Sequence, residues 1–577
     1  MAKKKTSKKK STLAGSSPMA RARALLSKLT LGTVLALVFG VFSLWQITEQ
    51  DIYWQIRAGD ELLRTRTFPH VETWSYAAKG QPWMNGQWIS TLIFRAAFYF
   101  GPAGLVLARG ALVFVLFDEL ARLVEKHAGS RGKVLAVPLT CTAVYVATAF
   151  RLQLRADLLV FALFTSVLLH AKARALSYRW LVFLVVLAAN IHPGTAPFVV
   201  VAAGFVVLTS AAPWKHKAWM APALGLAMFV TPYHVGVLPF LKRHFFYFEG
   251  QVLTNPDHQK WDSAMHLDTD HFGIAGVVWI GISAVGAIGV LLSLLGSKQR
   301  RFAALLALPL LVGFTWMSLN RVRAIPYHAI FISPYVAHAL RVLYLQLRRR
   351  RLPGWSVGVA PVALAALVFA WHLSTNKLVL GFSESRGMYP IDSVAFIKKH
   401  GIRPNLYHTF AFGAYTVWYL REFPDFVDPR ETPFRGVEED YLKAYGSAEH
   451  AQKLYQRYGI NAVLVPIPKT AMVPGLGFRD LIEEYLPAEG WALVYWDDIS
   501  VLVVRRIPEH AQVIKDHEYK LLRPNLPPGN LLAYGKPKPE LLRTYAREIE
   551  RCLAERPHDP VCKASDVALD RYRKQHP

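Results

Sequence analysis

The chain has 577 residues, 53% of them hydrophobic, and a mean hydropathy of +0.22. The hydrophobic residues occur in long blocks, which excludes an ordinary soluble protein and predicts a polytopic membrane protein. Much of the net charge of +27 lies in an N-terminal arm and in short loops between the blocks, which favours contact with anionic lipid and argues against nucleic acid as a partner. Three cysteines exclude a disulfide-rich scaffold.

Residues 1–28 form a basic arm without acidic residues, which we expect to be disordered in the cytoplasm. Leu29–Ile47 is too long for a signal-peptide core and no small-residue cleavage site follows it, which predicts an uncleaved first span. Further apolar blocks continue to residue 374 and bring the total to about eleven spans. These blocks are Leu92–Phe117, Val134–Phe150, Leu158–His170, Trp180–Asn190, Ala196–Thr209, Trp219–Val230, Phe272–Leu295, Phe302–Leu319, Tyr327–Leu340 and Val357–His372.

Basic residues mark alternate loops between the predicted spans, in agreement with the positive-inside rule when the N-terminus is cytoplasmic. They are Arg122, Lys126, Arg131, Lys133, Lys172, Arg174, Arg179, Lys215, Lys217, Lys298, Arg300, Arg301 and Arg348 to Arg351. The odd number of spans then places the chain after residue 374 outside the cytoplasm. We therefore expect a multi-pass protein of the inner (cytoplasmic) membrane.

The first predicted outer loop, residues 48–90, carries carboxylates and aromatic rings directly after the first span. Its notable residues are Asp51, Trp54, Arg57, Gly59, Asp60, Glu72, Trp83 and Trp88. An interfacial helix with an aromatic belt is one interpretation. The other is a site for a polar substrate that is presented from the lipid.

Further ionisable and polar residues lie on the same predicted face, at helix ends or in short turns, where such placements typically mark a substrate path. They are Arg151, Arg155, Asp157, Asn190, His192, His234, His244, Glu249, Asp257, His258, Asp262, Arg321 and Arg323. The four arginines break the positive-inside pattern, and a guanidinium group matches two phosphate oxygens. The alternative is that they form structural ion pairs with Asp51, Asp60, Asp157, Glu249 or Asp262.

From about residue 385 the composition becomes that of a soluble protein and predicts a small extracytoplasmic α/β domain over residues 385–506. We expect helices over 389–401, 437–446 and 447–459, the last capped by Ser447, and strands over 405–410, 423–429 and 461–467. A hairpin is expected over 491–506. The tail, 507–577, begins as a proline-rich linker and continues as a helical hairpin. Cys552 and Cys562 flank its turn, and outside the cytoplasm they can join as a disulfide.

Familiar enzyme motifs such as GxSxG, a Walker loop, HExxH and paired CxxC do not occur in the sequence. We therefore expect no nucleotide cofactor; we assign no metal ligands, and a divalent metal stays an open alternative. A carboxylate and arginines on one outer face fit transfer from a lipid-linked sugar phosphate. The arginines neutralise the phosphate, and the carboxylate takes a proton from the acceptor hydroxyl as it attacks the anomeric carbon.

Several motifs occur in the order found in a group of bacterial membrane proteins similar to GT-C class glycosyltransferases, which use polyprenyl-phosphate sugars. In the outer loop they are Asp51-x-x-Trp54, Gly59, Phe68-Pro69, Ser75-Tyr76, Gly80-x-Pro82-Trp83 and Trp88. Later ones are Asn190-Ile191-His192-x-Gly194, Thr231-Pro232-Tyr233, Arg323-Ala324-Ile325-Pro326, Phe412-Gly413-Ala414-Tyr415 and Phe426-Val427-Asp428-Pro429-Arg430. The resemblance covers residues 29–506 and implies a GT-C-like membrane domain over 29–374.

The resemblance also implies roles for single residues. Asp51 takes the position of the catalytic carboxylate, and Arg321 and Arg323 become candidates for phosphate contact. Gln55 stands where the group often has histidine. Asn85 and Gln87 stand where the group often has more polar or acidic residues before the tryptophan. The loss of an acidic residue at Gln87 leaves fewer candidates for a metal site.

The sequence thus predicts a membrane glycosyltransferase that moves a hexosyl or pentosyl group from a polyprenyl phosphate to a glycan, lipid or protein acceptor outside the cytoplasm. With Asp51 as the catalytic residue, the expected substrate-binding residues are Trp54, Arg57, Asp60, Glu72, Trp88, Arg151, Arg155, His192, Glu249, Arg321 and Arg323. Two alternatives stay open. One is a transporter or flippase, although the sequence shows no internal repeat. The other is a non-catalytic scaffold of the cell envelope.

Overall fold

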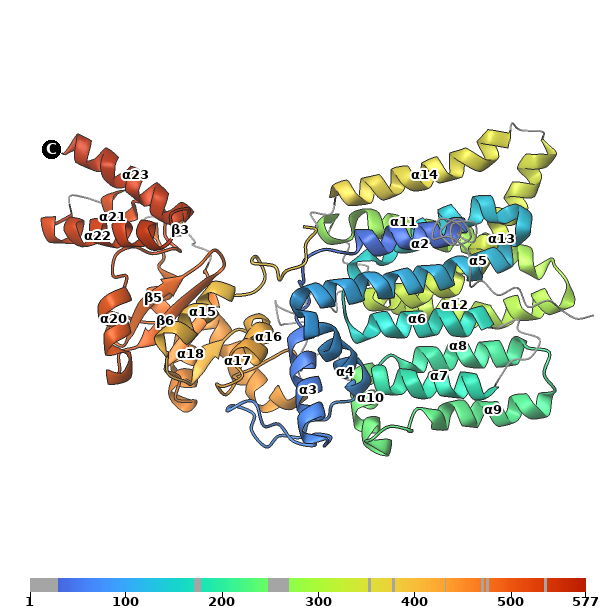
Figure 1. The fold of residues 1–577 in the computed structure, drawn as a ribbon, viewed down its shortest axis with the longest axis horizontal. Coiled ribbons are helices and arrows are strands. Elements are labelled where there is room, and N and C mark those ends of the chain that lie inside the picture. Colours follow the sequence, from blue (N-terminus) through green and yellow to red (C-terminus); the bar gives the residue numbers. More distant parts are fainter. Residues whose placement is uncertain are drawn as a thin grey trace, which may run out of the picture.

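The computed structural model describes residues 30–170, 178–246, 269–350, 354–375, 379–430, 432–468, 472–473, 477–533 and 537–576. Several residues discussed above lie outside these ranges, namely the arm 1–28, Lys172, Arg174, Glu249, Asp257, His258, Asp262 and Arg351. The described chain is mostly helical, with a small sheet in its C-terminal part. In Figure 1 the long helices lie side by side to the right, and the sheet with its own helices lies to the left.

Apolar helices form the first part of the chain. They are α2 (Leu31–Phe42), α5 (Gly101–Thr148), α6 (Ala156–Leu169), α7 (Tyr178–Ile191), α8 (Ala196–Thr209), α9 (Trp214–Ala227), α11 (Thr269–Leu294), α12 (Lys298–Asn320), α13 (Ile325–Arg349) and α14 (Gly354–Thr375). Among the described residues, four helical segments are long and apolar enough to cross a membrane: Trp88–Arg151, Gly273–Leu294, Lys298–Asn320 and Val322–Arg349. The chain is a multi-pass membrane protein, and the number of about eleven spans stays a prediction.

Helix α5 contains a break that divides its 48 residues into two parts. Gly129, at φ 68° and ψ 175°, has a backbone conformation that favours glycine because other residues would bring Cβ against the backbone. The two parts correspond to two separate predicted spans. Glycines also allow α2 and α5 to pack closely. If Gly40 of α2 carried a Cβ atom, this atom would lie 2.9 Å from the backbone oxygen of Gly110 in α5.

The first outer loop folds into two short helices joined by an irregular segment. These helices are α3 (Ile52–Thr65) and α4 (Trp88–Ala97), and the short 3₁₀ helix η1 (Phe98–Phe100) joins α4 to α5. A Cβ on Gly59 of α3 would lie 2.3 Å from the backbone oxygen of Thr91 in α4, so the two helices are in close contact. The other face of α3 packs against the C-terminal domain, which places Asp51, at its N-terminal end, between bundle and domain.

The C-terminal domain is built on a four-stranded mixed sheet in the order β1-β2-β6-β5. Its strands are β1 (Leu406–His408), β2 (Ala462–Pro466), β5 (Trp491–Trp496) and β6 (Ser500–Arg505). β1 and β2 are parallel, and the other neighbours are antiparallel, including the predicted hairpin β5–β6. The helices around them are α15 (Ile391–His400), α16 (Phe410–Tyr419), α17 (Arg435–Gly446) and α18 (Ala448–Arg457), and Ser447 caps α18 as predicted. The short strands β3 (Met472–Val473) and β4 (Gly477–Phe478) pair separately.

The strand expected over residues 423–429 was wrong. This segment is irregular, and its Asp425 forms an isolated bridge with Ser75 of the outer loop instead of joining the sheet. Helix α16, which precedes it, was not predicted. The apolar and aromatic residues of 423–429 have the composition of a strand, but they are buried because they pack between the outer loop and the domain.

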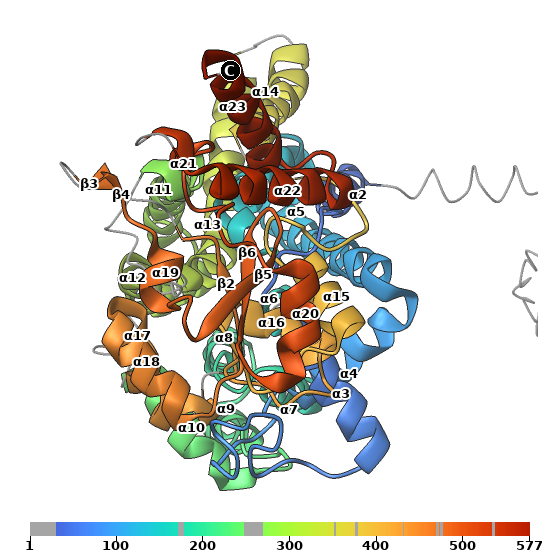
Figure 2. The ribbon, with the colours of Figure 1, turned by 90° about the vertical axis from the view of Figure 1, so that its left-hand side faces the viewer.

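The tail shares its hydrophobic core with the sheet. Helices α20 (Ala511–His517), α21 (Asn530–Ala533), α22 (Pro539–Glu555) and α23 (Pro560–Gln575) follow β6, and Figure 2 shows α22 and α23 above the sheet. Glu548 of α22 accepts hydrogen bonds from the N–H groups of Lys520, Leu521 and Leu522. A disulfide joins the cysteines of α22 and α23 across a Cα–Cα distance of 6.1 Å.

Candidate active site

Asp51 lies directly before α3, and its side chain forms an ion pair with Arg155, which precedes α6. Arg155 uses its other terminal nitrogen, Nη1, to contact Glu49 Oε1 at 3.2 Å. The indole Nε1 of Trp54 donates to Asp51 Oδ1 at 3.4 Å. The guanidinium group of Arg155 therefore bridges two carboxylates that stand two residues apart in the chain.

A second ion pair lies on the same segment, between Arg151 at the end of η2 (Ala149–Arg151) and Asp157 in the first turn of α6. Asp157 Oδ1 also lies 3.5 Å from Nε2 of His192. A carboxylate in the first turn of a helix is favoured by the positive end of the helix dipole. The C-terminal end of α7, next to His192, thus meets the N-terminal end of α6.

The junction between α12 and α13, which contains Arg323, also lies near these residues. Arg323 lies in η7 (Val322–Ala324), and its charge acts on both Asp157 and His192. Arg321 stands two residues earlier in the same junction and is partly exposed. We call the charged residues joined in this way the rim cluster, which comprises Glu49, Asp51, Arg151, Arg155, Asp157, His192 and Arg323.

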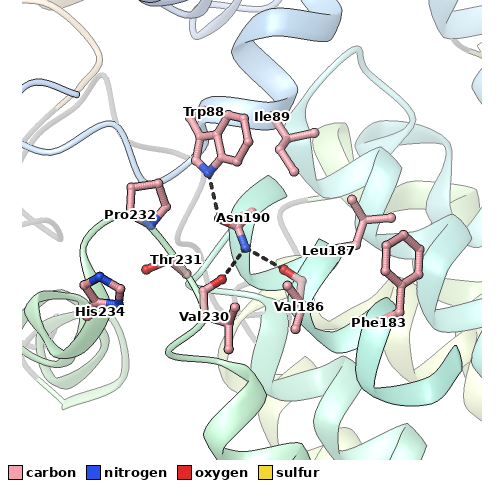
Figure 3. Close-up of a pocket in the computed structure, with 10 residues that line it drawn as sticks. All are labelled: Trp88, Ile89, Phe183, Val186, Leu187, Asn190, Val230, Thr231, Pro232 and His234. Carbon is pink, nitrogen blue, oxygen red and sulfur yellow. Dashed lines mark hydrogen bonds between the residues drawn. The ribbon is translucent and has the colours of Figure 1, made fainter. Parts of the chain in front are cut away.

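An apolar pocket of about 340 Å³ lies beside the rim cluster. It is lined by Trp88, Ile89, Phe183, Val186, Leu187, Asn190, Val230, Thr231, Pro232 and His234. Asn190 connects three sides of the pocket by hydrogen bonds (Figure 3). Its Oδ1 accepts a hydrogen bond from the indole of Trp88 at 2.7 Å, and its amide nitrogen donates to the backbone oxygens of Val186 and Val230. Asn190 is two residues before His192, so the pocket and the rim cluster both draw a residue from the C-terminal end of α7 and the position just after it.

Arg57 and Asp60, which we expected to bind substrate, make contacts away from this cluster. Arg57 Nη1 donates to the backbone oxygen of Val417 at 2.8 Å, in the C-terminal domain. Asp60 pairs with Arg95 of α4 at 2.8 Å and with Arg421 at 3.3 Å. Both side chains of α3 thus connect the outer loop to its neighbours.

Glu72 is part of a buried ion-pair group between the outer loop and the C-terminal domain. Arg430 contacts Glu72 Oε2 at 2.5 Å and Asp428 Oδ2 at 2.6 Å, and its guanidinium carbon lies 3.9 Å and 4.6 Å from the ring centres of Trp74 and Trp83. Burial lowers the pKa of Arg430, but the two carboxylates outweigh burial, so the pKa is raised and the group stays charged.

A buried histidine–carboxylate pair, which we had not predicted as a site, lies close by. His408 Nε2 is 2.8 Å from Asp425 Oδ1, and the hydroxyl of Thr416 lies 3.3 Å from both atoms. The backbone N–H of Asp425 donates to Trp74 in the outer loop at 2.8 Å. Burial lowers the pKa of His408, but the charge and hydrogen bond of Asp425 outweigh it and raise the pKa. The sequence signal that could have indicated this pair was the charged residue Asp425 within the expected strand over residues 423–429.

Metal-ligand side chains do not group at the rim cluster in the described part of the chain. Within the described residues, the one group of metal-ligand side chains lies in the tail and consists of Cys552, Asp559 and Cys562. A disulfide occupies both of its sulfur atoms. At the positions where the resemblance would offer metal ligands, Gln55 Nε2 donates to Gln87 Oε1 at 2.7 Å, a neutral amide pair.

No family model and no curated protein matches the chain. Among solved structures, it is similar to ArnT from Cupriavidus metallidurans in the apo state, with 14% identity and a TM-score of 0.49 over 86% of this chain and 99% of that chain. The same protein bound to undecaprenyl phosphate has 13% identity and a TM-score of 0.48 over 85% and 99% of the two chains. An oligosaccharyltransferase from Archaeoglobus fulgidus in complex with Zn and sulfate has 13% identity and a TM-score of 0.44 over 75% and 68%.

Proposed function

We propose that this protein is a membrane glycosyltransferase that moves a hexosyl or pentosyl group from a polyprenyl phosphate to an acceptor outside the cytoplasm. The observation that supports it is the rim cluster. A carboxylate, Asp51, stands among arginines at the ends of membrane helices, beside an apolar pocket. Helix-end ions inside a membrane protein are costly and typically serve a substrate path.

Basic loops at the opposite end of the bundle support the proposed orientation. Lys126 donates to the backbone oxygen of Leu169 at the end of α6. Arg341 of α13 lies beside the break in α5, because its guanidinium carbon is 3.8 Å from where a Cβ atom on Gly129 would stand. Basic loops favour the cytoplasmic side of the membrane. The rim cluster at the other ends of these helices then faces away from the cytoplasm, as a lipid-linked donor requires.

The donor divides into an apolar chain and a charged head, and the site offers a place for each. The pocket lined by Trp88 and Phe183 takes the first part of the isoprenoid chain. The arginines of the rim cluster, with Arg321, take the phosphate, because guanidinium groups match phosphate oxygens in pairs. No nucleotide site is needed, since the lipid carries the sugar.

The reaction is a direct displacement. The acceptor oxygen forms a bond to the anomeric carbon while the bond from that carbon to the phosphate oxygen breaks. The electron pair of the broken bond leaves with the polyprenyl phosphate, whose growing negative charge the arginines stabilise. Asp51 takes the proton of the acceptor hydroxyl as general base.

The test compares envelope glycans and polyprenyl-linked sugars in cells that produce the wild-type protein, Asp51→Asn or no protein. We expect Asp51→Asn to lower transfer by about 100-fold or more at an unchanged protein level, because the amide accepts no proton. Arg95→Ala, which removes an arginine outside the rim cluster, is the matched control and should keep transfer. Normal glycan with Asp51→Asn would reject the proposal and favour the scaffold.

A further inference from the structure

We propose that Arg155 masks Asp51 until a lipid phosphate arrives, and that the phosphate then takes over the Arg155 nitrogen that Asp51 had held. The exchange would leave Asp51 with its charge and without this partner when the donor is in place. This inference rests on the proposed function, because it concerns the same carboxylate and the same donor. It adds an order of events: donor first, active base second.

The geometry of Arg155 suits such an exchange. Its two terminal nitrogens serve different carboxylates, Nη1 contacting Glu49 and Nη2 contacting Asp51. The side chain of Glu49 is 3% exposed, whereas those of Asp51 and Arg155 are 12% and 13% exposed. The Asp51 side chain is therefore more accessible to a ligand than that of Glu49. The contact with Glu49 keeps Arg155 in position while the contact with Asp51 changes.

The charges of the rim cluster also favour an exchange over simple addition. Its carboxylates, Glu49, Asp51 and Asp157, form ion pairs with two of its arginines, Arg155 and Arg151. A phosphate that binds either of these two guanidinium groups must compete with a carboxylate for it. Arg151 is the poorer choice, because its side chain is only 7% exposed and is held by Asp157.

The exchange would link donor binding to the strength of the base. A carboxylate in contact with a guanidinium group is a weaker base than the same carboxylate without it. While the donor is absent, Asp51 is therefore held in a less reactive form. When the phosphate removes the Arg155 contact, Asp51 becomes able to accept the proton of the acceptor.

The exchange can be tested by binding measurements alone, without measuring glycosyl transfer. If Asp51 and the phosphate compete for Arg155, then removal of the charge on Asp51 must strengthen phosphate binding. A purely structural ion pair predicts the reverse, because loss of a buried partner disturbs the position of Arg155. The sign of this change in affinity, together with its loss when Arg155 is removed, therefore separates the two.

The experiment measures equilibrium binding of radiolabelled undecaprenyl phosphate to the full-length protein in lipid nanodiscs, with undecaprenol as the arm without phosphate. We expect Asp51→Asn to bind the phosphate lipid on the order of tenfold more tightly, within the usual range of coupling between sites. Arg155→Ala should bind it more weakly, and Asp51→Asn should bring no gain in the Arg155→Ala background. Undecaprenol should bind equally to all variants.

Asp60→Asn is the matched control, because it removes a carboxylate with an arginine partner on the same helix but outside the rim cluster. It should leave the affinity unchanged. Where Asp51→Asn does not accumulate as folded protein, Asp51→Ser removes the same charge and should give the same gain. An unchanged or weaker affinity of the neutral Asp51 variants, or a gain that persists in Arg155→Ala, overturns the exchange.

The failure of this inference differs from a failure of the proposed function. If Asp51→Asn retains glycosyl transfer, the proposed function fails and the exchange fails with it. If transfer is lost and the gain in binding does not appear, Asp51 stays a candidate base and only the exchange is rejected.

Discussion

Arg430 shows how a single residue joins the outer loop to the C-terminal domain. Its guanidinium group lies between two indole rings and contacts two carboxylates, and only 1% of its side chain is exposed. A buried charge of this kind is tolerated because its partners replace the lost water. The position of Asp51 depends on such contacts, since α3 lies between the bundle and this domain.

Removal of the charge on Glu72 should therefore destabilise the docking of the two parts. We expect Glu72→Gln to lower the free energy of unfolding by about 3 kcal/mol, since Arg430 keeps Asp428 as its remaining partner. The measurement is thermal unfolding in detergent together with protease cleavage of the outer loop. Asp60→Asn should cost only about 0.5 kcal/mol, because its pair is partly exposed. Equal effects of the two variants would contradict the assignment of Glu72 to a buried ion-pair group.

His408 makes the same contact region sensitive to pH. Because Asp425 raises the pKa of His408 above its ordinary value of 6.5, the folded state holds the proton more tightly than the unfolded state. The stability that this provides is fully present below pH 6.5 and is lost as the pH rises through the raised pKa. We expect the unfolding temperature to fall over that interval in the wild-type protein.

His408→Gln supplies the comparison for this pH dependence. The variant should be less stable than the wild type at acidic pH, and its unfolding temperature should change little as the pH rises above 6.5. A wild-type profile that rises over this interval, or a variant with the full wild-type slope, would show that other groups set the dependence.

At the scale of single residues, the sequence indicated which side chains share a face and left their pairing open. Asp51 and Arg155 are 104 residues apart, and nothing local in either segment indicates that they meet. Their common placement was predictable because both stand at helix ends on the same predicted side. Glu49 was missed as the second partner of Arg155, although it stands two residues before Asp51.

At the scale of elements, apolar blocks predicted helices well because a membrane helix must satisfy all its backbone hydrogen bonds internally. The break at Gly129 also corresponds to a gap between two predicted spans. The secondary structure of segments that are buried by distant partners was harder to predict. Residues 423–429 have the composition of a strand, yet Asp425 forms a bridge with Ser75 of the outer loop, and α16 packs against α3.

At the scale of the whole molecule, the predicted division into a sheet domain and a separate tail does not reflect how the core is shared. Tyr545 and Ile549 of α22 belong to the same core as Trp491 and Trp496 of β5. The proline-rich composition after residue 506 indicated a linker because it lacks periodicity. Lys520 and Leu522 are instead held by Glu548 from later in the chain, and Arg523 and Asn525 by Asp480 from earlier in the chain. No local pattern reveals these contacts.

The orientation in the membrane is the property on which the proposed chemistry depends most, since a lipid-linked donor must meet its acceptor outside the cytoplasm. Two exposed positions distinguish the possible orientations: Glu489 before β5, and Lys298 at the start of α12, on the basic end of the bundle. In a Cys141→Ala background, we expect an impermeant maleimide to label Glu489→Cys in intact spheroplasts. Lys298→Cys should react only after permeabilisation, because basic loops stay on the cytoplasmic side. The reversed pattern would turn the rim cluster toward the cytoplasm, where an acceptor outside the cytoplasm could not reach Asp51.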